Sequence, residues 1–594
     1  MMNRYSLGAS AILIIASVIA IASAWHDSPI VDEIPHIGAG YSYIADHTHE
    51  FNPEHPPLSK DLAGLALLPL KINPEFLSVY NDAHPGIVND QWNFGRTLIY
   101  HSGVDPITLI HLAKLPLVLF FIFSGWLIYL WSKRTYNSRA ALLTVFLFAF
   151  CPTIIAHSRF VTTDVPALFG VLFATYFFVR YLREQSASWR NPNFWLASFS
   201  FGLALLTKFS TFLLVPYFLI LAIVWAWSQH REYFKPTIRL ITRTGLVMTV
   251  GFVVIVGPIY QLHVFNYPPV QQKSDTSTIL ANYQIPVLAH VIIWASDKPV
   301  LRPYAQWGLG LAMVYQRAEG GNRTYFLGQF SSKSFKAYFP VVYALKEPIP
   351  FLILLLSAIW LGWRAWRTAR EPFKNKIRDH FPAFAMLLWI FIYVATSINA
   401  NLNIGIRHLI PIYGFIFILV AGQIEARITK QELRSKNENK KSLILNSKLL
   451  ILVLLGWYLL EFVSVYPYYL TYFNQFAGGP SGGHNYVVDS NLDWGQDLWR
   501  LGDFVKQNNI QKIYLDYFGW AEQSFYLSNS FQWIHAGQFT NAEQFLKENP
   551  SGGWLGVSVS YYQESTVDPA KPYAWLGQPT AVIGNSIFVW HITQ

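Results

Sequence analysis

The chain has 594 residues, of which 53% are hydrophobic and only 13% are charged. A soluble domain carries about 25% charged residues, so this composition argues against a soluble protein and indicates a membrane protein with many spans. The net charge of +10 does not predict nucleic-acid binding, because Lys and Arg concentrate in short loops between apolar stretches. A single cysteine, Cys151, excludes internal disulfides and any zinc site built from several cysteines.

Apolar stretches of about twenty residues, the length that crosses a bilayer as a helix, recur along the chain. The first ends in Ala22-Ser23-Ala24 and imitates a cleaved signal peptide, but in a chain with many later spans we expect a retained anchor. The fold class that follows is a polytopic α-helical membrane protein with about eleven transmembrane helices. The expected spans are residues 7–25, 106–131, 140–157, 162–182, 194–208, 211–228, 244–264, 349–366, 382–398, 407–425 and 448–468.

Basic residues between the spans set the expected orientation. By the positive-inside rule, the side on which they gather is the cytoplasm. The opposite side of the plasma membrane then receives the loops of residues 26–105 and 265–348 and the tail. We therefore expect a transmembrane part of residues 1–468 and an extracytoplasmic tail of residues 469–594. The basic segments are Lys133-Arg134 with Arg139, Arg183–Arg190, Arg231–Arg243, Arg364–Arg378 and Arg427–Lys448.

The tail has a different pattern from the rest of the chain, with short β-type runs around an amphipathic helix. This alternation predicts a small α/β domain. The predicted helix covers residues 498–505. The predicted strands cover residues 486–488, 510–517, 554–559 and 581–590.

Carboxylates stand at the outer ends of the predicted spans. Asp32 and Glu33 follow the first span directly, and Asp164 lies in the short turn between the third and fourth spans. Ionisable groups are costly to place at a membrane edge, so they predict a functional site. A carboxylate can act as a general base on an acceptor hydroxyl or amine. We therefore take Asp32, Glu33 and Asp164 as candidate catalytic residues.

Cations are expected at the same interface. For Lys208 and Arg407 an alternative is that they reach out to lipid headgroups. Cations beside a leaving phosphate would stabilise the transition state, and a lipid-phosphate sugar donor presents its phosphate at this depth. The predicted partner is therefore a polyprenyl-phosphate sugar, with its tail among the helices and membrane lipid around it. The candidate phosphate-binding residues are Lys60, Arg159, Lys208, Arg407 and His55.

Several ordered motifs together resemble the GT-C class of membrane glycosyltransferases. The resemblance is to family 39, the protein O-mannosyltransferases, and to the lipid A aminoarabinose transferases, and it covers about residues 1–425. The motifs are Asp32-Glu33, Glu54-His55-Pro56-Pro57-Leu58, Arg159–Asp164, Leu327–Phe330 and Gly405–Pro411.

The resemblance implies roles for individual residues. Asp32 matches the acid of the first loop that is proposed as base or acceptor-binding group, and Asp164 matches a second essential acid. His55 stands where the aminoarabinose group has a phosphate-contacting lysine, so that contact would fall to another cation. Glu54 matches a glutamate that some relatives use in a metal site, and with His36 or His55 it could hold a divalent ion. The spacing is no strong zinc signature, and we favour chemistry that requires no cofactor.

The function expected from the resemblance is inverting transfer of a sugar from a lipid-phosphate donor on the extracytoplasmic face. The acceptor is left open among a protein, a lipid and a glycan. An alternative is a transporter or flippase of lipid-linked sugars. It would need a polar path through the bilayer, often with repeated halves. The chain shows no repeated halves, and its polar residues gather at one face.

Overall fold

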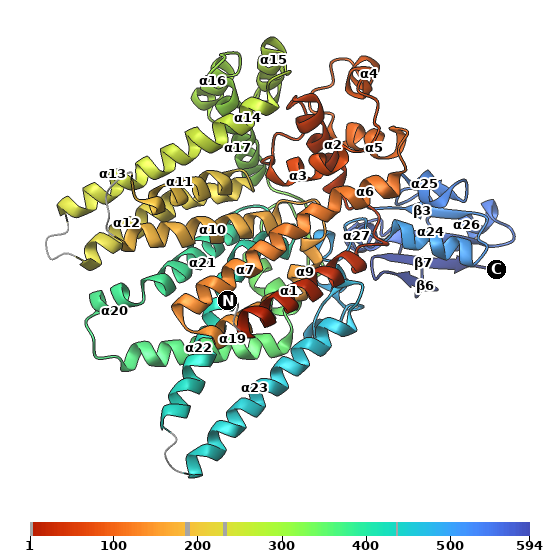
Figure 1. Ribbon diagram of the computed structural model, residues 1–594. Coiled ribbons are helices and arrows are strands. Elements are labelled where there is room, and N and C mark those ends of the chain that lie inside the picture. Colours follow the sequence, from red (N-terminus) through yellow and green to blue (C-terminus); the bar gives the residue numbers. More distant parts are fainter. Residues whose placement is uncertain (1–3, 185–189, 230–233, 435–437, 594) are drawn as a thin grey trace.

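The computed structural model describes residues 4–184, 190–229, 234–434 and 438–593. Long helices form one bundle, with loop helices at one end and a small sheet beside them (Figure 1). Among the described residues, nine helical segments are long and apolar enough to cross a membrane. They are α1 (Arg4–Ser23), α6–α7 (Pro106–Lys114 and Val118–Thr135), α10 (Asp164–Arg183), α12 (Leu214–Gln229, with the 3₁₀ turn Phe209–Leu213), α13–α14 (Phe234–Gly251 and Gly257–His263), α19 (Ile349–Thr368), α21 (Phe381–Asn399), α22 (Ile410–Arg434, preceded by the 3₁₀ turn Ile406–Leu409) and α23 (Glu438–Ser464).

A tenth segment is bent. Helices α8 (Ser138–Ala149) and α9 (Pro152–Ser158) meet at an angle of 65°. Pro152 explains the break, because proline lacks the N–H that would continue the ladder of α8. The polytopic helical fold class is therefore confirmed, with nine or ten spans in the described residues.

Eleven spans were predicted, and the one that the structure does not show as a span is residues 194–208. It forms α11 (Pro192–Leu205), whose 14 residues fall short of the length expected of a span. The helix nevertheless carries the chain back along α10, because Lys208, just after α11, reaches Asp164 at the start of α10. A Cβ on Gly202 would lie 2.4 Å from the carbonyl oxygen of Gly251, so glycine allows α11 and α13 to approach closely.

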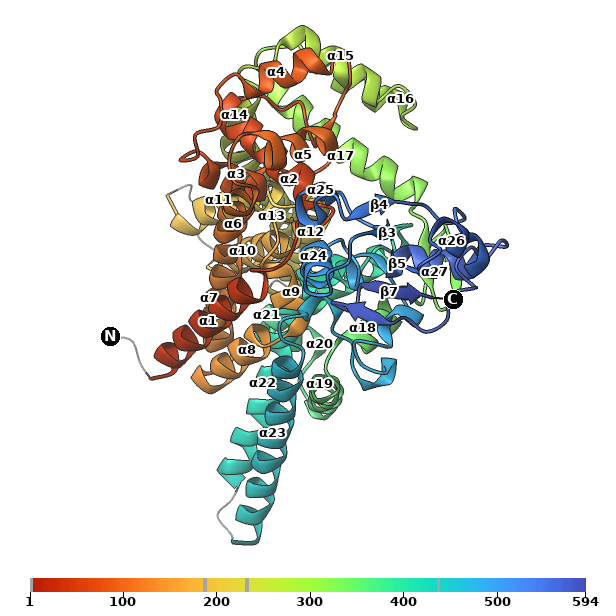
Figure 2. The same cartoon turned by 90° about the vertical axis from the view of Figure 1, so that its right-hand side faces the viewer.

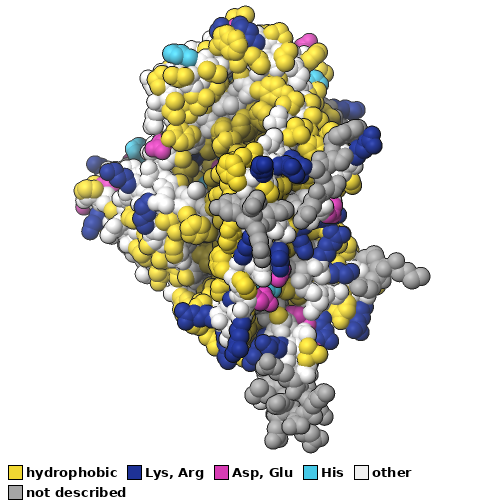
Figure 3. Space-filling view, turned by 90° about the vertical axis from the view of Figure 1, so that its left-hand side faces the viewer, with side chains coloured by type: hydrophobic (Ala, Val, Ile, Leu, Met, Phe, Trp, Pro, Cys, Tyr) yellow, Lys and Arg dark blue, Asp and Glu magenta, His cyan; other side chains and the backbone are white. Residues whose placement is uncertain are grey.

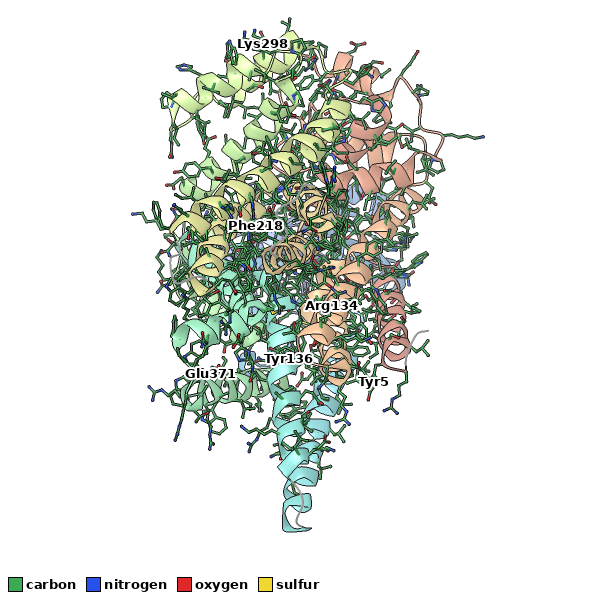
Figure 4. The ribbon with its side chains drawn as sticks, turned by 60° about the vertical axis from the view of Figure 1, so that its left-hand side comes forward. Tyr5, Arg134, Tyr136, Phe218, Lys298 and Glu371 are labelled. Atoms are coloured by element: carbon green, nitrogen blue, oxygen red, sulfur yellow. The ribbon has the colours of Figure 1, made fainter. Side chains whose placement is uncertain are left out.

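Labelled side chains and the α22–α23 hairpin distinguish the two ends of the bundle. Figure 4 shows Tyr5 and Glu371 in the lower half of the view and Lys298 at the opposite, upper end. Broad hydrophobic areas, interrupted by clusters of Lys and Arg, cover the face drawn in Figure 3. Parts of the predicted basic loops, residues 185–189, 230–233 and 435–437, lie outside the described residues. Helices α22 and α23 extend as a hairpin beyond the rest of the bundle (Figure 2).

We call the opposite end of the bundle the loop end, because two long loops cover it with short helices. The first loop contains α2 (Glu33–Tyr41), α3 (Leu58–Leu67), α4 (Phe76–Ala83) and α5 (Gln91–His101). The second contains α15 (Pro269–Ile279), α16 (Pro286–Ala295), α17 (Arg302–Gly320), the hairpin β1 (Thr324–Phe326) and β2 (Gln329–Ser331), and α18 (Tyr338–Lys346). The short helix α20 (Phe373–Asp379) joins α19 to α21.

The tail folds around a five-stranded mixed sheet with the order β4-β3-β5-β7-β6. Strand β3 is parallel to both neighbours, whereas β7 is antiparallel to β5 and β6. The elements are α24 (Leu498–Gln507), β3 (Ile513–Asp516), α25 (Gln523–Leu527), β4 (Phe531–Trp533), α26 (Ala542–Glu548), β5 (Gly553–Ser558), α27 (Val559–Val567), β6 (Ala581–Ile583) and β7 (Ile587–Ile592).

The predictions for α24, β3 and β5 agree with the structure, whereas the short helices α25, α26 and α27 were not predicted and three strand assignments differ. The predicted strand 486–488 is wrong, since only Val487 pairs, in an isolated bridge with Phe326. The predicted strand 581–590 is a hairpin, because the chain turns at Gly584 and Asn585, both with positive φ. Strand β4 was not predicted, since its three residues are too few to show a period.

Candidate active site

A cavity of about 220 Å³ opens at the loop end, between the first loop, α17 and the ends of α12 and α21. Its wall includes the candidate residues Asp32, Glu54, His55, Lys208 and Arg407. These residues come from four separate parts of the chain, so only the folded bundle brings them together.

Two acids and two cations form a connected cluster at this cavity. Arg407 Nη1 lies 2.5 Å from Asp32 Oδ2 and 3.8 Å from Asp164 Oδ2. Lys208 Nζ lies 2.6 Å from Asp164 Oδ1. Asp164 is fully buried in the first turn of α10, where the helix dipole favours a negative charge. The four side chains predicted from separate turns therefore lie in one site.

The tail completes this cluster. Ser490 Oγ accepts a hydrogen bond of 3.1 Å from Arg407 Nε, and the ring of Trp494 lies 4.2 Å from the guanidinium carbon. Asn491 Oδ1 accepts a bond of 2.9 Å from the backbone N–H of Ile406. Sequence reasoning missed these residues because the tail was read as a separate unit. The polar run Asp489–Asp497, which fits no strand or helix period, was the available signal.

The electrostatics of the cavity follow from burial and from these pairs. Burial would raise the pKa of Asp32, but the charge of Arg407 outweighs it and holds that pKa below its ordinary value. Burial lowers the pKa of His55 well below its usual range, so this ring is neutral at pH 7. The cavity therefore carries an ionised carboxylate already paired with a guanidinium.

Arg317 is a cavity residue that the sequence reading did not select. It lies on the exposed side of α17 and lines the cavity. Among the described residues it forms no ion pair within 4 Å, whereas Lys208 and Arg407 are both engaged by carboxylates. An unpaired cation at the cavity wall is suited to an incoming anion. No signal in the sequence pointed to Arg317, because it lies in a helix of the second loop and not next to an apolar span.

Glu33 points away from the cavity, contrary to its predicted catalytic place. Its carboxylate is fully buried and accepts backbone bonds of 2.9 Å from Val161 and 3.1 Å from Ile30. Lys114 Nζ lies 3.1 Å away and balances the charge. Neighbouring acids at the start of α2 thus face opposite ways, and Glu33 holds the turn after the third span against the first loop.

Arg159 and Lys60 are also held away from the cavity. Arg159 Nη1 lies 3.1 Å from Asp27, which in turn binds Arg500 of the tail at 2.7 Å. Lys60 Nζ is fully buried, with four oxygens of Tyr43, Asn52 and His55 at 2.7–3.0 Å.

Burial lowers the pKa of Lys60 to about 7. The four oxygen contacts hold the Lys60 amine against the Pro56-Pro57 loop and away from the cavity, so Lys60 is not placed to bind phosphate as predicted.

The candidate metal residues form hydrogen bonds with different partners. His36 Nδ1 lies 2.7 Å from the carbonyl oxygen of Val161, and Glu54 Oε1 accepts a bond of 2.6 Å from Gln91. In the part of the chain that the structure describes, no group of three His, Cys, Asp or Glu side chains could hold a metal ion. Glu54 and His36 therefore lack a third protein ligand.

Comparison with known proteins agrees with this architecture. Residues 110–256 match the family model described as dolichyl-phosphate-mannose-protein mannosyltransferase. The Saccharomyces cerevisiae protein O-mannosyltransferase Pmt1-Pmt2 complex, bound to the sugar donor, is similar in structure, with a TM-score of 0.55 and 12% identity. That match covers 85% of this chain and 92% of the yeast chain. The fold therefore has the GT-C architecture indicated by the sequence motifs.

Two further structures are similar over longer stretches but with lower scores. ArnT from Cupriavidus metallidurans, bound to undecaprenyl phosphate, matches with a TM-score of 0.45 and 12% identity over 98% of both chains. The oligosaccharyltransferase AglB from Archaeoglobus fulgidus, in complex with an inhibitory peptide and a dolichol-phosphate, matches with a TM-score of 0.47 and 12% identity. That match covers 95% of this chain and 71% of the archaeal chain. No curated protein matches the sequence.

Proposed function

We propose that the protein is an inverting glycosyltransferase that moves a sugar from a polyprenyl-phosphate donor to an acceptor at the extracytoplasmic face of the plasma membrane. The observation that carries this proposal is the cluster of Asp32, Arg407, Asp164 and Lys208 at a cavity where the membrane-crossing helices end. The family match and the likeness to a donor-bound protein O-mannosyltransferase support it.

The cavity suits a donor with a charged head and an apolar tail. Arg317, Lys208 and Arg407 supply positive charge for the phosphate. Phe209 and Leu213, the first and last residues of the 3₁₀ turn before α12, give the same cavity an apolar wall at the edge of the bundle. An isoprenoid tail would leave along this wall into the membrane, with its phosphate held at the cations.

Sugar transfer then needs one general base for the acceptor and positive charge that stabilises the leaving phosphate. Asp32 accepts the proton of the acceptor hydroxyl, and the acceptor oxygen forms a bond to the anomeric carbon. The bond between that carbon and the phosphate oxygen breaks, and the lipid phosphate leaves with the electron pair. The cations stabilise its growing charge. Direct displacement from the opposite side inverts the anomeric centre and needs no carboxylate nucleophile, unlike retaining glycosidases.

Arg407 links donor binding to the base. In the structure its guanidinium is shared between Asp32 and Asp164. A donor phosphate competes for the same guanidinium, and each hydrogen bond that it gains weakens the hold on Asp32. The carboxylate becomes more basic as the donor arrives, because burial then acts on its pKa with less opposition.

The proposed orientation rests on charge. Basic loops lie between the membrane-crossing helices at the end away from the cavity, as the positive-inside rule requires of the cytoplasmic side. The cavity then faces away from the nucleotide sugars of the cytoplasm, which favours a lipid-linked donor.

The direct test compares donors. Purified protein in lipid nanodiscs is given a polyprenyl-phosphate sugar or the matching nucleotide sugar, each with a mixture of membrane-extract acceptors. We expect transfer from the lipid donor only, with release of polyprenyl phosphate. Efficient transfer from the nucleotide sugar, with none from the lipid donor, would refute the proposal. Movement of the lipid-linked sugar across a vesicle membrane without transfer would instead identify a flippase.

A further inference from the structure

A second cavity, of about 90 Å³, lies on the tail side of the site. Ile404 lines both this cavity and the one that holds Asp32 and Arg407, so the two are neighbours. The second cavity is built by three parts of the chain: the β1–β2 hairpin, the tail segment around Asp489, and α27 with Ser560, Tyr561 and Glu564.

Asp489 joins the two cavities electrostatically. It lines the second cavity, and burial raises its pKa to about 6, against the opposing charge of Arg407. Its φ of 58° is left-handed, a conformation that aspartate adopts more readily than most residues but still at a cost. The backbone N–H of Ser490 donates to its Oδ1 at 2.5 Å. The carboxylate is therefore fixed beside the reacting cluster by a strained turn.

The second cavity combines carboxylates, hydroxyls and aromatic rings with one buried donor that lacks a partner among the described residues, Asn403 Nδ2. Glu564 Oε1 lies 2.5 Å from Arg323, whose guanidinium carbon lies 5.0 Å from the ring centre of Phe330. The one cation of the lining is thus already paired. The rings of Phe518 and Tyr561 meet edge to face at 5.6 Å. A ligand here must combine polar groups that donate and accept hydrogen bonds with a flat apolar surface.

A sugar ring brings both. Its hydroxyls donate to carboxylates, and its C–H-bearing face packs on an aromatic ring. A peptide brings one backbone donor per residue and is usually recognised by an open strand edge, which a cavity of this volume does not supply.

We propose that this second cavity is the acceptor subsite, that it binds one sugar unit of a glycan acceptor, and that Asp489 and Tyr561 are its principal ligand-contacting residues. The proposal rests on the proposed function and names the acceptor class that the function leaves open.

The test measures glycan binding apart from transfer. Full-length protein in nanodiscs is applied to a printed glycan array, and the strongest binder is titrated. Asp489→Asn keeps the left-handed turn and its acceptor for Ser490, and Tyr561→Ala removes the ring. We expect each to weaken glycan binding roughly tenfold, the scale of losing one hydrogen bond to a charged group. Trp533→Ala, an exposed ring on β4 outside the cavity, is the matched control and should leave binding unchanged.

Undecaprenyl phosphate is titrated in parallel, so that failure of the subsite is separated from failure of the enzyme. Binding of the lipid phosphate with no glycan bound, or glycan binding unchanged in both variants, would overturn the subsite while leaving the proposed function standing. Binding of a Thr-containing peptide that is lost in both variants would replace the glycan by a protein acceptor. If the wild-type protein does not bind the lipid phosphate, the proposed function is contradicted. Glycan binding on the array would still test the subsite independently.

Discussion

Two adjacent acids, Asp32 and Glu33, should respond to the same chemical change in opposite ways. Asp32→Asn removes the proposed base with little change in shape, so turnover should fall by about 10²–10⁴-fold, the range for losing a general base. Arg407 keeps Ser490 at 3.1 Å and Asp164 at 3.8 Å, so its charge remains partly compensated. We therefore expect a folded, donor-binding and nearly inactive protein.

Glu33→Gln should instead act on stability. Lys114 is 6% exposed in its side chain and faces Glu33 at 3.1 Å, so the substitution leaves a buried ammonium without its counter-charge. Breaking one side of a buried pair costs about 3–5 kcal/mol. Thermal unfolding should move to lower temperature, whereas turnover per folded molecule should stay within about threefold of the wild type.

The assay uses nanodisc-embedded protein, a radiolabelled lipid-phosphate sugar and single-turnover kinetics, with the folded fraction measured by size-exclusion chromatography. Near-normal turnover in folded Asp32→Asn protein would remove that carboxylate from the mechanism. Loss of turnover in folded Glu33→Gln protein, with Asp32→Asn active, would mean that the two roles have been assigned the wrong way round.

The pH profile tests the link between Asp32 and Arg407. Because Arg407 holds the pKa of Asp32 below its ordinary value, the base stays ionised from pH 5 to 7 and is lost only as the pH falls through that low pKa. In Arg407→Met, burial acts with less opposition, which then comes from His36 and Arg317, and the acid limb of kcat/KM should move up by about 1–3 pH units. Burial raises the pKa of Asp489 to about 6, so this carboxyl could also shape the acid limb; the same pH profile measured in Asp489→Asn shows its share. An unmoved acid limb would contradict the link.

Three further outcomes follow from the geometry. In intact cells, an impermeant thiol reagent should label Asn529→Cys in the tail and not Arg370→Cys between α19 and α20; the reverse pattern would invert the orientation. Arg317→Ala should weaken binding of the lipid phosphate about tenfold, the scale of one charge-assisted contact, and an unchanged affinity would remove it from the phosphate site. Lys60→Met should lower the unfolding temperature, because the buried carbonyl oxygens of Asn52 and His55 lose their hydrogen-bond donor. The affinity of the folded protein for the lipid-phosphate sugar should stay unchanged, and a selective loss of that affinity would restore the predicted role of Lys60.

The sequence was most informative at ionisable residues that stand next to an apolar span, because burying a charge there costs free energy. Asp32, Asp164, Lys208 and Arg407 stand next to apolar spans, where an ionisable group is expensive, and the fold brings all four together. The same signal also selected Glu33 and Arg159, which lie opposite buried partners. Sequence alone cannot separate these two cases, because a charge paired inside the protein and a charge facing a cavity satisfy the same energetic requirement.

Other features depend on contacts between distant segments. Trp494 and Ser490 belong to the site only because the tail docks on Arg407. The hydrophobic pattern of the tail gives no sign of that contact. The short helix α11 was predicted as a full span because its apolar composition resembles one. Its length is set by the turn at Thr207 and by the pairing of Lys208, which hydropathy does not register.

The meeting of Asp32 and Trp494 at one guanidinium has a consequence for biogenesis. More than four hundred and fifty residues separate these two side chains, and Arg407 is held between them. When α23 has been synthesised, Asp32 and Asp164 are in place, but Ser490 and Trp494, which contact this arginine from the tail, have not yet been made. The contacts of Ser490 and Trp494 with Arg407 therefore form only after the tail has been made and has docked on the bundle.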